Sequence, residues 1–112
     1  MIIHDIDKQG NVAVLALSGR LDAVAAPEFE NRLNQLIDQR EYAIVIDCGE
    51  LAYISSAGLR SILSPAKKMK AAEGRLIVAN AQESVSKVFH LSGIHTIIPL
   101  VAAVEEAVAS LQ

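Results

Sequence analysis

The stretch from Ala43 to Arg60 reads AIVIDCGELAYISSAGLR, and it carries the strongest indication of the fold class. It opens with four apolar residues in succession, Ala43 to Ile46, without the alternation of a strand that has one face in water. Such a run is typical of a central strand of a parallel sheet. We expect this strand to end at Asp47–Gly49 and a helix to begin at Ser56, where the apolar spacing changes to 3.6 residues. The stretch therefore predicts a strand–loop–helix unit of an α/β sheet.

The residues before this stretch predict a hairpin and a helix. Gly10 and Asn11 lie between two short apolar stretches and indicate a hairpin turn. The second strand of the hairpin is expected from Asn11 to Leu17, ending at Ser18–Gly19. Pro27 suits the first turn of a helix, where its missing N–H costs nothing. The apolar face of that helix is formed by Phe29, Leu33, Leu36 and Ile37.

The residues after this stretch repeat the alternation of helix and strand. The helix from Ser56 is expected to end near Gly74, with Pro65 kinking it or shifting its boundary. A buried strand at Leu76–Ala79 follows, then a short helix that ends at Gly93. Ile97–Ile98 is the candidate for a short edge strand, and a final helix follows Val101. The apolar face of the longer helix comprises Leu59, Ile62, Leu63, Ala66 and Met69, and that of the last helix comprises Val104, Val108 and Leu111.

This order of elements predicts an α/β fold in one domain that spans residues 1–112. Repeated strand–helix units favour a single mixed β-sheet with a parallel centre, antiparallel N-terminal strands and about four α-helices. The 112 residues are enough to bury a core without a disulfide or a metal.

Composition and charge exclude several classes of protein. The net charge of −3 does not favour binding to nucleic acid or to anionic lipid. No apolar run approaches the roughly 20 residues that cross a bilayer, and the N-terminal residues lack the apolar core of a signal peptide. The single cysteine, Cys48, permits no internal disulfide and is consistent with a reducing compartment. We therefore expect a soluble cytoplasmic protein.

Ser56 is the candidate for chemistry, because it stands where the second helix is expected to begin. Its hydroxyl is expected to be the N-cap of that helix, a role worth about 1 kcal/mol. A phosphoryl group there would carry about −1.5 to −2 charges, next to the positive end of the helix dipole, so the fold would tolerate it. Asp22 and Asp47 are expected at the same end of the sheet, either accepting hydrogen bonds from turn amides or contacting a partner.

Three motifs in this order resemble the STAS-domain family, and specifically its anti-sigma-factor antagonists (anti-anti-sigma factors). Gly19–Asp22 matches the Gly-x-Leu-Asp turn of the family. Tyr53–Arg60 matches the hallmark in which an aromatic residue, a serine pair, a glycine and a leucine follow a buried strand ending in Asp. Val88–Ile94 matches the pattern ahead of the last strand. The resemblance covers nearly the whole chain and implies a STAS fold.

The resemblance also implies a mechanism of partner switching in bacterial signalling and transcription regulation. The phosphorylated serine of the family maps onto Ser56. The unphosphorylated protein would bind a serine-kinase anti-sigma factor, phosphorylation of Ser56 would release it, and a serine phosphatase would reset the switch. Two departures from the family are Ser55, where Asp is frequent, and Ala25, where Ser or Thr is frequent. The expected partner contacts are Asp22, Tyr53, Ser55, Ser56, Gly58 and Arg60.

Two other classes of function stay open. Similar domains serve as constitutive subunits of transporters or lipid-trafficking complexes and bind the cytoplasmic face of a membrane protein, although the length of the chain and Ser56 favour the switch. An enzyme has least support, since Ser55–Gly58 is not a Gly-x-Ser-x-Gly nucleophile elbow and no glycine-rich nucleotide loop is present. We expect a monomeric regulator without catalytic residues or cofactor.

Two further groups of side chains have an ordinary structural interpretation. The three histidines, His4, His90 and His95, lack the spacing of metal ligands, so no metal site is expected. The lysine cluster is interpreted first as a solvated helix face and second as a surface that meets an acidic partner. It comprises Lys67, Lys68 and Lys70.

Overall fold

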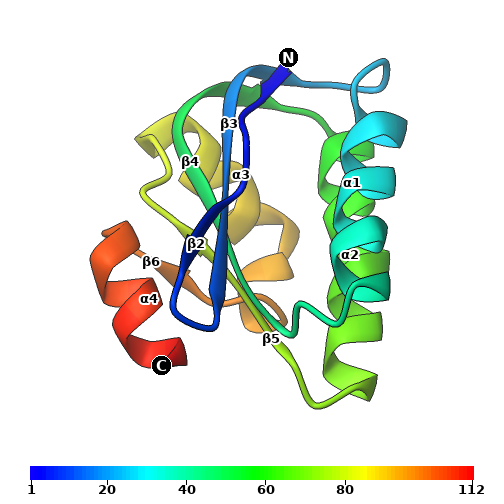
Figure 1. Cartoon of the computed structure of the whole chain (residues 1–112). Coiled ribbons are helices and arrows are strands. Elements are labelled where there is room, and N and C mark those ends of the chain that lie inside the picture. The colour runs from blue at the N-terminus through cyan, green and yellow to red at the C-terminus, as the bar shows by residue number, and fades with distance from the viewer.

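Six strands and four α-helices make up the computed structural model, which describes residues 1–112 (Figure 1). The strands are β1 (Ile2–Ile3), β2 (Asp7–Gln9), β3 (Val12–Leu21), β4 (Ala43–Ile54), β5 (Arg75–Ala79) and β6 (Leu100–Val101). The helices are α1 (Ala26–Asp38), α2 (Ser56–Ala71), α3 (Glu83–Ser92) and α4 (Val104–Leu111), with a 3₁₀ turn, η1 (Ile94–Thr96), after α3. None of the helices combines the length and the apolar character needed to span a lipid bilayer.

The sheet is mixed, as the sequence predicts. Strands β3, β4, β5 and β6 are parallel neighbours in that order, while β1 and β2 both pair antiparallel with β3. The hairpin between β2 and β3 turns at Gly10, whose φ of +63° is a conformation that glycine adopts without strain. The parallel centre and the antiparallel N-terminal strands are thereby confirmed.

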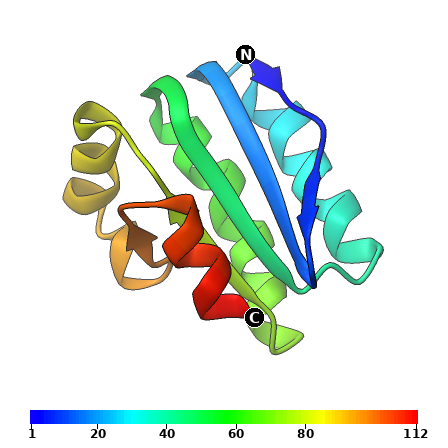
Figure 2. The same cartoon turned by 60° about the vertical axis from the view of Figure 1, so that its left-hand side comes forward.

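The two faces of the sheet are covered unequally. A large apolar cluster joins one face to α1, α2 and α3, with Phe29, Ile62 and Phe89 among its fully buried side chains. A smaller cluster on the other face packs beneath α4, where Ala107 and Val108 meet the sheet. Figure 2 shows α4 on one side of the sheet, with α1 and α2 behind it. The stripe of apolar residues predicted for the last helix is therefore the face that packs on the sheet.

Strands β3 and β4 are both longer than predicted. β3 continues through Ser18–Gly19 to Leu21, and β4 continues through Asp47–Gly49 to Ile54. The two strands pair in parallel over this extra length, with register shifts at Ala16/Ser18 and at Gly19/Arg20. Glycine and aspartate are weak strand formers, but the shift in register between Ala16 and Ser18 accommodates Cys48 and Gly49 as an irregularity, and pairing with β3 resumes at Glu50.

One prediction about the second half of the chain needs correction. Residues Ile97–Ile98 are not an edge strand: Ile98 is buried in the large cluster, and the edge strand that pairs with β5 is Leu100–Val101. Of the two effects expected of Pro65, a shifted boundary is not seen: Pro65 lies inside α2, and buried residues before and after it pack against the core. Gly93 ends α3 as predicted, with a left-handed φ of +80°.

Candidate partner-binding site

The ends of β3 and β4 and the beginning of α2 meet at one end of the sheet. Because β3 and β4 are parallel neighbours, Arg20 lies in register with Tyr53 near their carboxyl ends. The N–H of Ser55 donates to the carbonyl of Leu21 over 3.0 Å, which ties the start of α2 to the end of β3. All six predicted contact residues lie at or next to this end of the sheet: Asp22, Tyr53, Ser55, Ser56, Gly58 and Arg60.

The two adjacent serines have different roles, and the helix cap is Ser55 rather than the predicted Ser56. Ser55 has an extended backbone, and its Oγ accepts a hydrogen bond from the N–H of Gly58 over 3.1 Å. Ser56 is already the first residue of the helix; its side chain is exposed and takes part in no hydrogen bond within the protein. A cap must come from the residue before the first helical turn, and a pair of serines does not reveal which one holds that position.

This division of roles predicts opposite results for two matched substitutions. Ser55→Ala is expected to destabilise the domain by about 1 kcal/mol, because the N–H of Gly58 loses its acceptor in a half-buried setting. Ser56→Ala is expected to change the free energy of unfolding by less than about 0.5 kcal/mol, since the hydroxyl has no partner. Urea unfolding of both variants measures the difference. Equal losses, or a larger loss for Ser56→Ala, would contradict the assignment of the cap.

Gly58 is buried between α2 and the end of β3. A Cβ atom there would overlap the carbonyl oxygen of Leu21 and lie 2.9 Å from Cγ1 of Ile54. The close approach that a glycine permits in the first turn is thus made within the domain. Gly58 positions its neighbours and presents no side chain to a partner.

Asp22 organises the turn between β3 and α1. Its Oδ1 accepts hydrogen bonds from the N–H groups of Val24 and Ala25, both over 3.1 Å. These bonds, that of Ala25 foremost, hold the pKa of the Asp22 carboxyl below its usual value. Ala25 itself provides no side-chain cap for α1, and the two amides that Asp22 binds precede the first turn of that helix. Of the two interpretations of Asp22, the structure supports the turn contacts.

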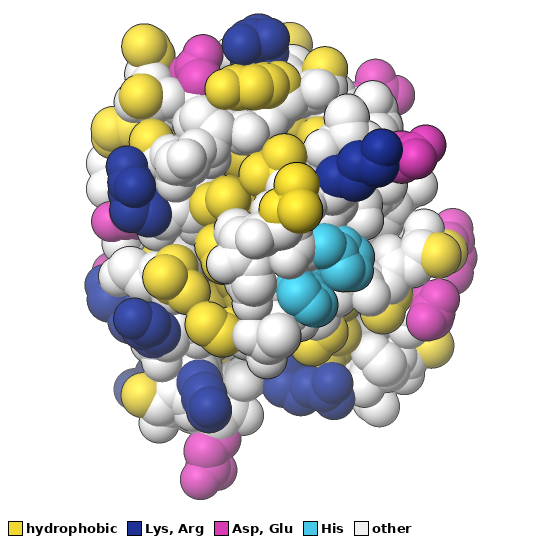
Figure 3. Space-filling model, turned by 180° about the vertical axis from the view of Figure 1, so that it is seen from behind, with side chains coloured by type: hydrophobic (Ala, Val, Ile, Leu, Met, Phe, Trp, Pro, Cys, Tyr) yellow, Lys and Arg dark blue, Asp and Glu magenta, His cyan; other side chains and the backbone are white.

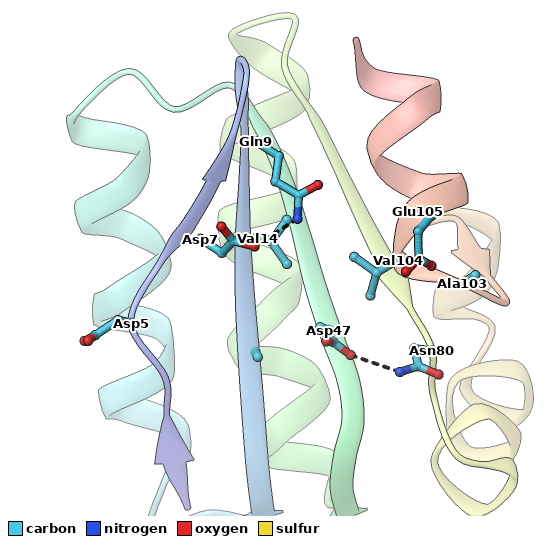
Figure 4. Close-up of a pocket in the computed structure, with 10 residues that line it drawn as sticks. Asp5, Asp7, Gln9, Val14, Asp47, Asn80, Ala103, Val104 and Glu105 are labelled. Carbon is cyan, nitrogen blue, oxygen red and sulfur yellow. Dashed lines mark hydrogen bonds between the residues drawn. The ribbon is translucent and has the colours of Figure 1, made fainter.

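Asp47 does not belong to this site. It lies within β4, where its Oδ1 accepts from the N–H of Gly49 over 3.0 Å and from the amide of Asn80 over 3.3 Å. Figure 4 shows this pair on the face of the sheet beside α4, in a hollow that Asp5, Asp7 and Glu105 also line. The expectation that Asp47 lies beside Ser56 followed from ending the strand at Asp47–Gly49, whereas β4 continues to Ile54.

Arg20 is a site residue that the sequence analysis missed. Its guanidinium lies 4.1 Å from the centre of the Tyr53 ring, a cation–π contact on an exposed surface. Tyr53 is 39% exposed, so its other face and edge are available to a partner. Only the register of β3 and β4 brings these two residues together, and no spacing along the chain signals it. Arg60 is exposed on α2 and takes part in neither of the two ion pairs of the protein.

A shallow groove between α1 and α2 adjoins these residues. Ala26, Pro27 and Glu30 line it from α1, and Ala57 and Arg60 line it from α2. Val24, on the turn that Asp22 organises, is 90% exposed. The end of the sheet therefore combines a free hydroxyl, two cationic side chains and two exposed large apolar side chains, a composition suited to binding another protein.

The structure provides no cluster of three His, Cys, Asp or Glu residues that could hold a metal ion. The one cysteine, Cys48, is buried in the large cluster. Burial, together with the charge of Asp47, raises the pKa of its thiol to about 12. The thiol is therefore protonated at neutral pH and packs as a small apolar side chain.

The fold and the arrangement of β3, β4 and α2 define a class of protein. A family model described as the STAS domain matches residues 4–107. The chain belongs to the STAS-domain family.

Comparison with individual proteins shows which members of the STAS family this chain is similar to. The anti-sigma factor antagonist BtrV of Bordetella bronchiseptica is 34% identical over 107 residues, which cover 96% of this chain and 92% of that protein. A crystal structure of an anti-sigma factor antagonist from Thermotoga maritima matches with a TM-score of 0.90 at 18% identity, over 96% of this chain and 92% of that one. SpoIIAA from Bacillus in its phosphorylated form matches with a TM-score of 0.76 at 24% identity, over 99% and 100% of the two chains. Within the STAS family, the chain belongs with the anti-sigma-factor antagonists.

Proposed function

We propose that this protein is a partner switch in which Ser56 is the phosphorylated residue. The unphosphorylated form binds a serine-kinase anti-sigma factor and so keeps it from its client. The kinase transfers a phosphoryl group from ATP to Ser56 and is thereby released, and a serine phosphatase removes the group. The protein acts as a binding partner and a substrate in this cycle, and the catalytic groups belong to the kinase and the phosphatase.

The free, exposed hydroxyl of Ser56 is the observation that carries this proposal. Because Ser55 holds the N–H of Gly58, phosphorylation of Ser56 breaks no hydrogen bond of the fold. The new charge would lie at the N-terminus of α2, where the helix dipole favours an anion. The names of two relatives point the same way, since BtrV is described as an anti-sigma factor antagonist and SpoIIAA was solved in a phosphorylated form.

Phosphorylation of Ser56 adds negative charge to the site, and this charge would weaken binding to the kinase. The Oγ of Ser56 attacks the γ-phosphorus of ATP, its proton passes to a base of the kinase, and ADP leaves. A neutral hydroxyl thus becomes a group with about −1.5 to −2 charges. Burying that charge in an interface packed around a neutral side chain costs several kcal/mol unless a cation meets it. The domain stays folded while its affinity for the kinase falls.

Intact mass spectrometry tests the assignment of the acceptor. The protein is incubated with its cognate anti-sigma kinase and ATP, and we expect one added phosphate. Ser56→Ala is expected to abolish the addition, whereas Ser55→Ala is expected to retain it despite its lower stability. Addition to Ser56→Ala would contradict the choice of residue. A wild-type protein that gains no phosphate would favour a constitutive subunit of a membrane-protein complex.

Arg60 is expected to affect the stability of the domain only in the phosphorylated state. It lies four residues after Ser56 on α2, the spacing at which an anion toward the N-terminus and a cation toward the C-terminus attract each other best. Arg60→Gln is expected to leave the unphosphorylated domain unchanged and to destabilise the phosphorylated one by about 0.5–1 kcal/mol. Thermal unfolding of both forms of both proteins measures this. Equal effects in the two forms would show that Arg60 does not contact the phosphate.

A further inference from the structure

A second groove lies far along α2 from Ser56. It runs between the C-terminal half of α2 and the segment that leads from η1 to β6. Met69 and Ile98 form buried parts of its floor, while Ile97 stands on its edge with 53% of its surface exposed. Exposure of a large apolar side chain to water is unfavourable, so burial of Ile97 against a partner would be favourable.

The rim of this groove is positively charged. Lys67 and Lys70 line it, no carboxylate lines it, and neither lysine is in an ion pair. Arg75 also borders the groove, but its guanidinium donates to the carbonyl of Ser110 on α4. The whole chain has a net charge of −3, so the positive charge of this rim is opposite in sign to the net charge of the protein. A lysine in the last turn of a helix, such as Lys70, interacts favourably with the helix dipole. The dipole does not account for Lys67, which precedes the last turn, or for the exposure of Ile97.

The third lysine of the cluster is directed elsewhere. The Nζ of Lys68 donates to the side-chain oxygen of Asn34 on α1, over 3.1 Å, and Lys68 does not line the groove. Figure 3, which shows the molecule from behind, displays a band of hydrophobic side chains with Lys and Arg side chains along one side of it. The groove therefore joins an apolar strip to a cationic border.

We propose that this groove binds an acidic segment of a partner protein, with an apolar side chain of that segment against Ile97 and its carboxylates beside Lys67 and Lys70. The concave shape fits a polypeptide segment better than the flat surface of a membrane. Lys67 lies eleven residues after Ser56 on the same helix, about 16 Å along its axis. Binding in the groove is therefore independent of the charge on Ser56, and a partner held there stays bound while the switch changes state.

The experiment uses the full chain and a defined peptide. A ten-residue peptide of Asp and Glu with two leucines is titrated into isotope-labelled protein and followed by NMR. We expect shifts centred on Lys67, Lys70, Thr96 and Ile97, and equal affinity for the Ser56→Asp variant. The double variant K67E/K70E is expected to bind at least about tenfold more weakly. Lys68→Glu, which introduces the same kind of charge change outside the groove, is expected to bind within about twofold of wild type.

Several results would overturn the proposal. A peptide with Lys in place of Asp and Glu that binds equally well would remove the charge argument, as would unchanged binding by K67E/K70E. Ile97→Ser keeps the charges and should weaken binding of the acidic peptide without changing the fold; unchanged binding would remove the apolar contact. Concentration-dependent dimerisation that Ile97→Ser abolishes would assign the groove to a second copy of this chain. Binding to phosphatidylserine vesicles in preference to the acidic peptide would assign it to a membrane.

Discussion

Replacement of Gly58 by alanine is expected to destabilise the domain by about 2–3 kcal/mol. The added Cβ would overlap the carbonyl oxygen of Leu21 and lie 2.9 Å from Cγ1 of Ile54. Neither contact relaxes easily, because the first involves backbone at the end of β3 and the second a buried side chain. The start of α2 would have to move away from β3 and weaken the hydrogen bond between Ser55 and Leu21.

The sign of this effect distinguishes close packing from ordinary helix propensity. In an open helix, alanine is more favourable than glycine by about 1 kcal/mol, so a purely local effect would stabilise the variant. Ala57→Gly, one residue earlier, is the matched control and is expected to cost no more than about 1 kcal/mol. Urea unfolding gives both values. A Gly58→Ala variant as stable as wild type would show that α2 is not packed closely on β3 at this residue.

The Gly58→Ala substitution also tests whether partner binding depends on the position of α2. Because Gly58 is buried, it acts on a partner only through the position of α2. We therefore expect Gly58→Ala to weaken binding to the anti-sigma factor, by an amount that depends on how far the substitution displaces Ser56 and Arg60. A folded Gly58→Ala protein with unaltered affinity would mean that the start of α2 tolerates movement.

Local patterns were enough to predict most of the fold. The unbroken apolar run at Ala43–Ile46 and that at Leu76–Ala79 lie in parallel strands covered on both faces. Gly10 and Gly93 adopt the positive φ values that a hairpin turn and a helix end require. These features depend on residues close together in the chain, which is why the sequence reports them.

The predictions that were wrong depend on contacts between distant residues. Asp47–Gly49 and Ser18–Gly19 read as breaks, but each lies in a strand whose neighbour is far away in the sequence. The exposed pair of Arg20 and Tyr53 depends on the same register. The cap was assigned to Ser56 because a one-residue error in the start of a helix is invisible to periodicity.

Replacement of Ser56 by aspartate is expected to weaken binding to the cognate anti-sigma factor by about a hundredfold or more. A factor of 100 in affinity corresponds to about 2.7 kcal/mol, which the desolvation of one unpaired carboxylate in an interface supplies. The fold should be unaffected, because an anion in the first turn of α2 is favoured by the helix dipole and Ser56 has no hydrogen bond to lose.

A matched control separates the position of the charge from its presence. Ser84 is exposed in the first turn of α3, so Ser84→Asp adds the same charge to a similar helix start elsewhere on the surface. We expect Ser84→Asp to bind within about threefold of wild type, since an added charge outside an interface acts only through screened, long-range attraction or repulsion. Calorimetric titration gives both affinities, and urea unfolding shows that both variants are folded. If folded Ser56→Asp binds as tightly as Ser84→Asp, charge at position 56 does not release the partner, and the switch must operate elsewhere on the domain.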